Sequence, residues 1–364
     1  MKLYNFYKMG RQRSPFKINN VWLVSSYDDV KFCLEAHETF SSNKFKYLFE
    51  KSDLADIDQG VLSEVKNMLN SWILHSDYAE EVVQLKYQLT ALIHSYEDEE
   101  FKSIMETSLS NITQKIDPQR CDLKNDIVIP LMIKLAKFIL KIDKSFDEKE
   151  CYTHVFQVAY LLQKTTFTKD DILAFHESLT YLNACAPNQL SASMKIQYAL
   201  IIYAMTFNTS NLITNTLFNM FTHDYNWDAL KIKDIITETL RTESPLQSVM
   251  RVATTDIEMN GKQIKQGDFL SVIIGSANRD ERVFGDNAEE FLMNRKRKPL
   301  LSYGIGMHQC LGQKLSQNIA IHIIPKIWEL VKTSEIQHIT WEDLQGFRSV
   351  ESMVINEKHK EITV

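Results

Sequence analysis

Proline, glycine and linker-like segments are scarce in this sequence. The 364 residues include only seven prolines and ten glycines, and no Gly/Ser-rich or Pro-rich stretch divides them. No internal repeat or low-complexity segment stands out. Although the length exceeds the usual size of one domain, nothing in the sequence marks a boundary between two. We therefore expect residues 1–364 to form a single domain.

Long hydrophobic runs are also missing. No run of about 18 uncharged apolar residues, the length a membrane-spanning helix requires, occurs in the sequence. The most apolar candidate, residues 127–142, is interrupted by Lys134, Lys137 and Lys141, and residues 1–8 contain no apolar signal core. We predict a cytoplasmic protein that does not enter a membrane.

Positive charge is not in excess. The chain has 41 Lys and Arg against 47 Asp and Glu, a net charge of −6. This balance does not favour a nucleic-acid-binding surface. The hydrophobic fraction of 44% and the charged fraction of 24% are ordinary for a globular protein.

Paired cysteines are absent. The five cysteines are scattered, and none forms a Cys-x-x-Cys pair. An odd, scattered set argues against both a disulfide framework and a structural zinc site. We expect four of them, Cys33, Cys121, Cys151 and Cys185, to be ordinary core or surface residues. The fifth, Cys310, differs because of its neighbours.

The cysteine loop, residues 303–312, surrounds Cys310 with a histidine and three glycines, namely His308, Gly304, Gly306 and Gly312. Glycines allow the backbone to bend around a sulfur so that amide N–H groups point at it. An apolar helix predicted over residues 311–331 would direct its positive end at the same atom. The pattern predicts a cysteine thiolate that binds a metal, and a thiolate suits heme iron.

Helices dominate the predicted secondary structure. Residues 21–26 are typical of a strand and lead into a helix through residue 36, with Asp28 or Asp29 as its N-cap. Residues 62–221 have a helical pattern throughout. One segment, residues 126–143, has Pro130 in its first turn, and another, residues 194–220, is apolar nearly all round and should be a buried central helix.

Short strands follow a third helical region at residues 227–241. They are predicted at residues 249–253, 257–259 and 269–274, with Asn260 and Gly261 as a hairpin turn between the last two. We therefore expect a mainly α fold with a small β region near the cysteine loop.

Four motifs occur in order over residues 235–320. Glu238 and Arg241 form a Glu-x-x-Arg pair that shares one helix face, and residues 244–245 (Ser-Pro), residues 277–280 (Ala-Asn-Arg-Asp) and the cysteine loop follow. This order and spacing resemble the cytochrome P450 family of heme-thiolate monooxygenases, most of all its short, soluble bacterial members. A weaker resemblance covers residues 22–42.

The resemblance implies a role for each matching residue. Cys310 would be the axial ligand of heme b, held in a loop shaped by Gly304, Gly306 and Gly312. Arg251 and His308 would bind the heme propionates through cation–carboxylate pairing; the alternatives are a surface arginine and a loop histidine without a ligand. In addition, Glu238, Arg241 and Arg295 would form a buried ion-pair network.

An early helix departs from the family. The family usually has a His-x-x-x-Arg pair there as a further propionate contact, but Glu81 and Leu85 occupy these positions. Lys86 either substitutes for the arginine or faces solvent.

The central helix departs further. The resemblance implies an Ala-Gly pair, an acid and an alcohol above the heme, and the alignment places residues 204–209 there. Met205 then replaces the glycine, Phe207 the acid and Asn208 the alcohol. A one-residue shift would instead align Asn208 and Thr209 with the acid and the alcohol. Both alignments alter the usual proton relay, and the candidate catalytic residues are Thr206, Asn208 and Thr209.

Two surface features bear on partners. Residues 143–194 form a shorter segment than the substrate lid of the family. The alternatives are an open pocket, a pocket closed by a carrier protein or another protein, and shortened loops without functional meaning. The basic run at residues 295–298, with Lys314, either docks an acidic ferredoxin or is a solvated turn.

Three functional hypotheses remain at this point. The first is oxidation of a small organic substrate of specialised metabolism with O2 and electrons from a ferredoxin and its reductase. The second is another heme-thiolate reaction, such as peroxide-driven oxidation, oxidative coupling or rearrangement. The third is a non-catalytic heme protein that binds a ligand or a partner protein.

Overall fold

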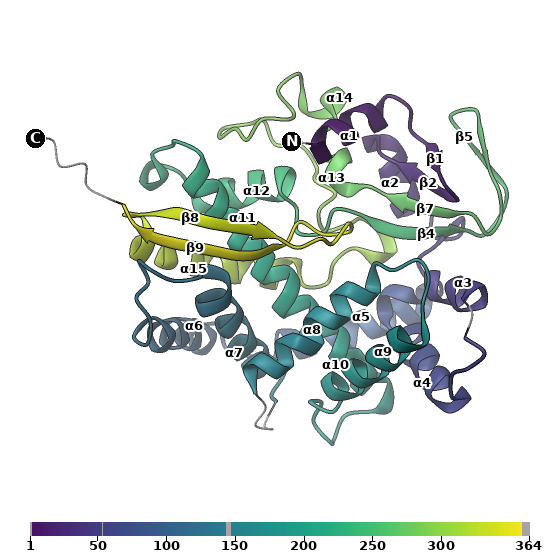
Figure 1. Cartoon of the computed structure of the whole chain (residues 1–364), viewed down its shortest axis with the longest axis horizontal. Coiled ribbons are helices and arrows are strands. Elements are labelled where there is room, and N and C mark those ends of the chain that lie inside the picture. Colours follow the sequence, from purple (N-terminus) through teal and green to yellow (C-terminus); the bar gives the residue numbers. More distant parts are fainter. Residues whose placement is uncertain (1, 53, 143–146, 359–364) are drawn as a thin grey trace, which may run out of the picture.

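Helices form most of the computed structural model, which describes residues 2–52, 54–142 and 147–358 (Figure 1). The α-helices are α1 Lys2–Arg11, α2 Tyr27–Glu35, α3 Lys44–Lys51, α4 Gln59–Asn70, α5 Ala79–Ile93, α6 Asp98–Thr113, α7 Ile129–Ile139, α8 Glu148–Leu162, α9 Lys169–Asn183, α10 Ala192–Tyr203, α11 Thr209–Thr222, α12 Ile232–Thr242, α13 Ile274–Ala277, α14 Glu281–Phe284 and α15 Gln313–Val331. Short 3-10 turns are η1 Ile73–His75, η4 Trp227–Ala229 and η5 Gly306–His308, and π-helical turns are η2 Leu123–Val128 and η3 Ala204–Asn208.

The strands form one sheet and two hairpins. They are β1 Phe16–Ile18, β2 Val21–Val24, β3 Phe40–Ser41, β4 Val249–Ala253, β5 Ile257–Met259, β6 Lys262–Ile264, β7 Phe269–Val272, β8 Ser334–Trp341 and β9 Val350–Glu357. The sheet has the order β1-β2-β7-β4-β3, in which only β2 and β7 run parallel, and the hairpins are β5–β6 and β8–β9. The expected mainly α fold with a small β region is thus confirmed.

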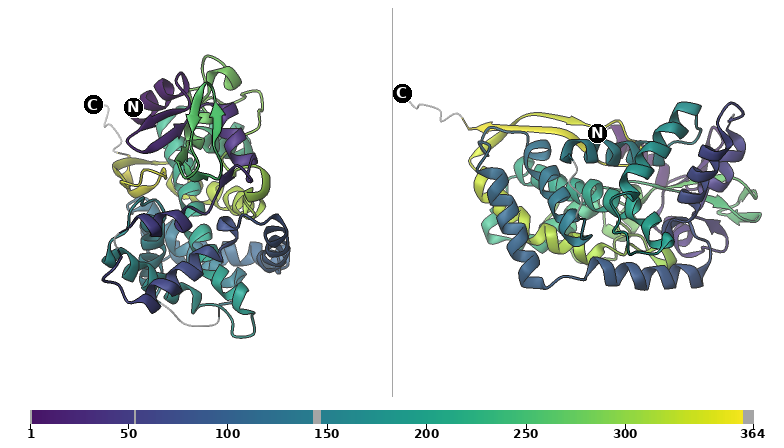
Figure 2. Two further views of the ribbon diagram at one scale, coloured as in Figure 1. Left: turned by 90° about the vertical axis from the view of Figure 1, so that its right-hand side faces the viewer. Right: turned by 90° about the horizontal axis from the view of Figure 1, so that it is seen from below.

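The sheet and the helices occupy different parts of the molecule. The sheet and α1 lie in the upper part, and the helices from α4 to α10 lie in the lower part (Figure 1; Figure 2, left). A cluster of buried side chains, including Val24, Val30 and Leu270, joins the sheet to α2. A larger cluster fills the space between the helices. Among the described helices, none is long and apolar enough to cross a membrane.

The predicted central helix is confirmed, but it is interrupted. Helices α10 and α11 are joined by the π-helical turn η3, and from residue 197 to residue 217 almost every side chain is buried. The helix predicted over residues 126–143 begins earlier, as the π-helical turn η2, and α7 ends at Ile139. Lys141 has φ +53°, a left-handed conformation that helices do not continue through. Residue 143 lies outside the described residues.

Two local predictions were wrong. Helix α2 is capped by Ser26, whose Oγ accepts from the Asp29 N–H at 3.4 Å, and not by Asp28 or Asp29. The Asn260–Gly261 turn joins β5 to β6, because the strand that begins at Phe269 pairs with β2 and β4 instead. The strands predicted over residues 21–26 and 269–274 end two residues early, at Val24 and Val272.

Candidate active site

The backbone of the cysteine loop requires glycine. Gly304 and Gly306 have φ of +65° and +72°, a region that residues with a Cβ rarely adopt. A Cβ on Gly306 would also lie 3.3 Å from the carbonyl oxygen of Leu34, at the end of α2. The loop is closed by the Cys310 N–H, which donates to the Tyr303 carbonyl at 2.8 Å. Sequence and tertiary packing therefore both fix this conformation.

Cys310 is exposed, whereas the other four cysteines are buried, and none of the five forms a disulfide. Enough protein nevertheless surrounds its sulfur that burial raises the pKa of the Cys310 thiol, while the Gly312 backbone N–H and the charge of Lys86 lower it. The Gly312 N–H is an amide donor of the kind that the glycine pattern predicts.

Arg251, on β4, is a buried cation without a counter-ion. The residue is 7% exposed, and its guanidinium donates to the Met250 carbonyl at 2.9 Å. No carboxylate lies within ion-pair distance of it in the described part of the chain. Burial lowers the pKa of Arg251 to about 10, and Cys33 and Asp77 raise it. An unpaired buried guanidinium is costly, so this side chain suits an anionic ligand.

Histidines gather near this arginine. The His308 Nε2 lies 3.1 Å from the Ser42 Oγ, and burial together with Arg251 lowers the pKa of His308 to about 3. His75, on η1, is buried; its Nδ1 lies 2.6 Å from the Leu69 carbonyl oxygen. Burial also lowers its pKa to about 3, with Arg251 contributing. The sequence analysis missed His75. The signal that could have found it is its position just before α5, the early helix in which Glu81 occupies the place of the family's histidine.

Lys86 also reaches the cysteine loop. Its Nζ, on α5, donates to the Gln309 carbonyl at 3.2 Å. Burial lowers the pKa of Lys86, and the nearby Cys310 sulfur raises it. Of the two residues that replace the usual pair, Glu81 accepts a hydrogen bond from Ser76 and Leu85 is buried. Lys86 therefore does not simply face solvent.

The predicted ion-pair network is confirmed. Glu238 accepts from the Arg241 Nη2 at 2.7 Å and from the Arg295 Nε at 3.2 Å. Arg241 also donates to the carbonyl oxygens of Asn278 and Ala288. The network connects α12 to the segment that leads into the cysteine loop. It engages Arg295 from the basic run at residues 295–298, and the next arginine in that run, Arg297, pairs with Asp234 at 2.9 Å.

Only two residues of the central helix are accessible near the π-helical turn. Between residues 197 and 217, Ala204 and Asn208 are partly exposed and the rest are buried. These two are four residues apart and share one face. Thr209 is 5% exposed beside them. The structure does not bring Thr206 to this face: it is fully buried, and its hydroxyl donates to the Ile202 carbonyl at 2.6 Å.

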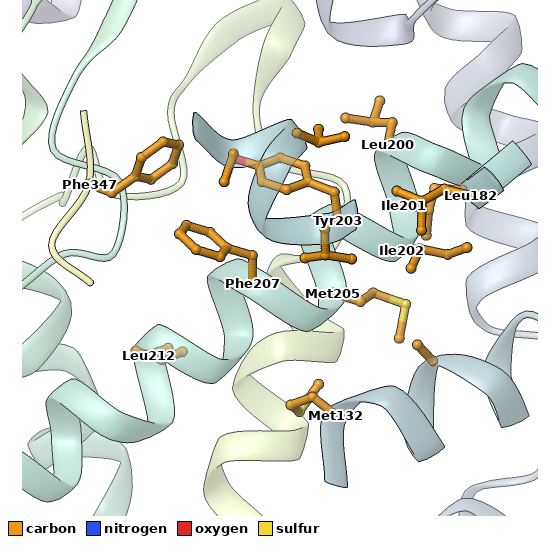
Figure 3. Close-up of a cluster of buried hydrophobic side chains, with 14 of the residues drawn as sticks. Met132, Leu182, Leu200, Ile201, Ile202, Tyr203, Met205, Phe207, Leu212 and Phe347 are labelled. Atoms are coloured by element: carbon orange, nitrogen blue, oxygen red, sulfur yellow. The ribbon is translucent and has the colours of Figure 1, made fainter. Parts of the chain in front are cut away.

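Phe207 points away from the accessible face. Its ring packs beside Tyr203 and meets Phe347 edge-on, with ring centroids 5.9 and 5.2 Å away (Figure 3). Met205 is also buried and belongs to the same hydrophobic cluster as Met132 of α7 (Figure 3). The accessible face thus offers a methyl group and an amide, Ala204 and Asn208, but no titratable side chain. Since π-helical turns often occur at functional sites, the position of Asn208 at the end of η3 is notable.

Comparisons with known proteins agree with these observations. The family described as Cytochrome P450 matches residues 232–327. Cytochrome P450 119 of Sulfolobus acidocaldarius is 24% identical over 95% of this chain and 97% of its own length. The biotin biosynthesis cytochrome P450 of Bacillus subtilis is 33% identical, over 40% of this chain and 39% of its own.

Solved structures show the same fold. P450BioI, crystallised in complex with an acyl carrier protein ligated to hexadec-9Z-enoic acid, superposes with a TM-score of 0.81 at 19% identity, over 98% of each chain. CYP109B1 of Bacillus subtilis superposes with a TM-score of 0.76 at 21% identity, over 97% of this chain and 98% of the other. Together with its loop and ion-pair motifs, these matches identify the chain as a member of the cytochrome P450 family of heme-thiolate monooxygenases, enzymes that bind heme b through a cysteine thiolate.

Proposed function

We propose that Cys310 is the heme ligand of this enzyme and that Arg251, His308 and Lys86 hold the propionates. The observation that carries this assignment is an accessible thiol in a loop whose His308 lies near Arg251, a buried guanidinium with no counter-ion among the described residues. Gly312 supplies an N–H to the sulfur, and Gly304 and Gly306 set the loop. When bound, a thiolate-ligated heme supplies the redox chemistry that activates oxygen.

A spectrum tests the ligand assignment directly. Reduced protein treated with CO should give the absorption band of a thiolate-ligated heme, and Cys310→Ala should abolish it. Cys151→Ala is the matched control, because Cys151 is a free cysteine that is 1% exposed. A thiolate-type band that survives in Cys310→Ala would refute the assignment.

The reaction that we propose is monooxygenation of a small organic substrate with O2 and two electrons from a ferredoxin-type partner. Asn208 and Thr209 are the residues of the central helix placed to orient water or substrate, because they lie on or beside its accessible face. Asn208 can donate and accept hydrogen bonds but cannot titrate. The relevant test is product formation with ferredoxin, ferredoxin reductase and O2, and Asn208→Ala should change turnover or the fraction of electrons that reach product.

A second reaction class is favoured by one observation. The accessible face of the central helix carries no titratable side chain among residues 197–217, so the usual acid for proton delivery has no equivalent there. Peroxide-driven oxidation, which brings its own protons, is the alternative. Product formed with peroxide but not with reductase and O2 would favour it. A normal CO band with no product under either condition would favour a non-catalytic heme protein.

Substrate delivery and electron delivery are further parts of the proposal. A protein of the same fold was crystallised with an acyl carrier protein, so carrier-bound acyl chains are tested beside free small molecules. For the ferredoxin, we propose docking near Lys296, Lys298 and Lys314, since Arg295 and Arg297 are engaged in ion pairs. Reduction by ferredoxin should then slow as ionic strength rises.

A further inference from the structure

One face of α11 and of the turn before it carries asparagines whose amide atoms lack partners. Asn208, Asn211 and Asn215 are three and four residues apart, so they share this face. Asn211 and Asn215 are fully buried. On this face, three buried side-chain atoms have no hydrogen-bond partner among the described residues: the Asn208 Oδ1, the Asn211 Nδ2 and the Asn215 Oδ1.

These three atoms alternate between acceptor, donor and acceptor. Buried polar atoms in proteins almost always have a partner, and ordered water commonly provides it. A water molecule both donates and accepts, so water next to Asn211 could bond to its amide N–H and to the oxygen of Asn208. The arrangement therefore points to internal water along this asparagine face.

A buried lysine connects to the same face. The Lys124 Nζ, on η2, donates to the Ser349 Oγ at 3.2 Å, and the Ser349 hydroxyl donates to the Asn211 Oδ1 at 3.0 Å. Lys124 is 1% exposed and also donates to the Val350 carbonyl. Its ammonium lies 5.9 Å from the centre of the Phe207 ring, so it approaches the central helix at the residue that the first alignment places in the position of the acid.

Lys124 is able to exchange its proton near neutral pH. Burial lowers its pKa to about 8, and Glu342, Asp122 and Glu351 raise it. Glu342 is only partly buried, and its backbone N–H donates to the Ser349 carbonyl at 2.9 Å, so this acid lies beside the same hydrogen-bonded segment. Burial raises the pKa of Glu342, and Lys124 lowers it. Glu342 therefore acts on the charge of Lys124 from a position that solvent partly reaches.

We propose that Lys124, Ser349 and internal water on the asparagine face of α11 form a proton route to the accessible side of Asn208. Lys124 gives a proton to the Ser349 oxygen, while the Ser349 hydroxyl turns from the Asn211 Oδ1 and passes its own proton to the water at the Asn211 amide. Lys124 is reprotonated from solvent through Glu342. The asparagines hold the water and do not carry the proton. The inference rests on the proposed oxygenation, because that reaction consumes protons at the pocket.

The first test does not depend on activity. A crystal structure of the heme-loaded protein, at a resolution that shows ordered water, should contain water bonded to the Asn211 Nδ2 and the Asn208 Oδ1. Lysine Nζ NMR should show Lys124 titrating near pH 8. If no water is bonded to either amide atom, the proton route is refuted, whatever the activity of the protein.

The second test uses Lys124→Met and Ser349→Ala. The fraction of electrons that reach product in the wild type should fall as the pH rises through about 8. Both variants should lose this pH dependence. The fraction of electrons that reach product should also be about tenfold lower than in the wild type, since positioned proton donors contribute at least that much. Lys124→Arg should keep part of the wild-type value.

Lys44→Met is the matched control. Lys44 is also a buried lysine, at 5% exposure, but it donates to the Leu162 and Lys164 carbonyls and not to the asparagine face. In this variant, the fraction of electrons that reach product should depend on pH as it does in the wild type. A wild-type pH profile in Ser349→Ala, which retains the lysine, would refute the route. If no oxidant gives product, the proposed function fails, and the water and the Lys124 titration still decide whether the site exists.

Discussion

Removal of the Glu238 carboxylate should destabilise the protein strongly. This carboxylate accepts from the Arg241 Nε and Nη2 at 2.9 and 2.7 Å, from the Leu292 N–H at 2.9 Å and from the Arg295 Nε at 3.2 Å. The side chains of Glu238 and Arg241 are 7% and 2% exposed, so solvent screens the pair weakly. Glu238→Ala would leave the Arg241 guanidinium buried without its anion.

The expected cost follows from that unpaired charge. Breaking a buried ion pair typically costs about 3–5 kcal/mol, and the separate hydrogen bonds are not added to this figure because they act as one unit. Denaturant unfolding, with the loss of helical signal as the readout, measures the change. Glu80→Ala is the control, since Glu80 is an exposed carboxylate on α5, and it should change stability by less than about 0.5 kcal/mol.

A double-mutant cycle separates the pair from its surroundings. Glu238→Ala combined with Arg241→Met removes both charges, so the double variant should be less destabilised than the sum of the two single variants. A loss below about 1 kcal/mol in Glu238→Ala would refute the argument that the network stabilises the fold. Strict additivity in the double variant would refute the argument that an unpaired charge is the cause.

Three further predictions concern the site. Gly306→Ala should destabilise the protein more than Gly267→Ala, because both residues have positive φ but only Gly306 lies against Leu34. The backbone strain in Gly267→Ala alone should cost about 1–2 kcal/mol. Equal losses of stability in denaturant unfolding would contradict the close-contact argument. Arg251→Leu should lower the heme-to-protein ratio of the purified protein and Arg251→Lys should lower it less, whereas an unchanged ratio in Arg251→Leu would remove this residue from the propionate assignment. Folding lowers the pKa of His75 to about 3, so below its ordinary pKa of about 6.5 the unfolded chain binds a proton that the folded protein does not, and the free energy of unfolding decreases as the pH falls toward 3. The difference between the free energies of unfolding at pH 7 and at pH 5 should therefore be about 2 kcal/mol smaller in His75→Gln than in the wild type. An unchanged difference would show that His75 is protonated in the folded protein.

The cysteine loop and the ion-pair network were predictable because their requirements are local. A thiolate with glycines on both sides, and a Glu-x-x-Arg pair on one helix face, carry their chemistry within a few residues. The buried central helix was predictable for a similar reason, since residues 194–220 are apolar nearly all round. The single-domain prediction and the roles of the individual site residues remain predictions.

Tertiary structure decided the rest. The approach of Lys86 to the Gln309 carbonyl, and of His75 to Arg251, joins residues far apart in the sequence. The partner of β5 depended on which strands could enter the sheet, and strand spacing alone does not specify this.

The sequence by itself determined the heme-thiolate motif, the helical fold and the departure of the central helix from its family. Only the tertiary structure decided that Asn208 faces accessible space while Thr206 is fully buried, and that Lys124 is linked to Asn211 through Ser349. The physical reason is that a sequence fixes which residues share a helix face, whereas the packing of other elements fixes what that face meets.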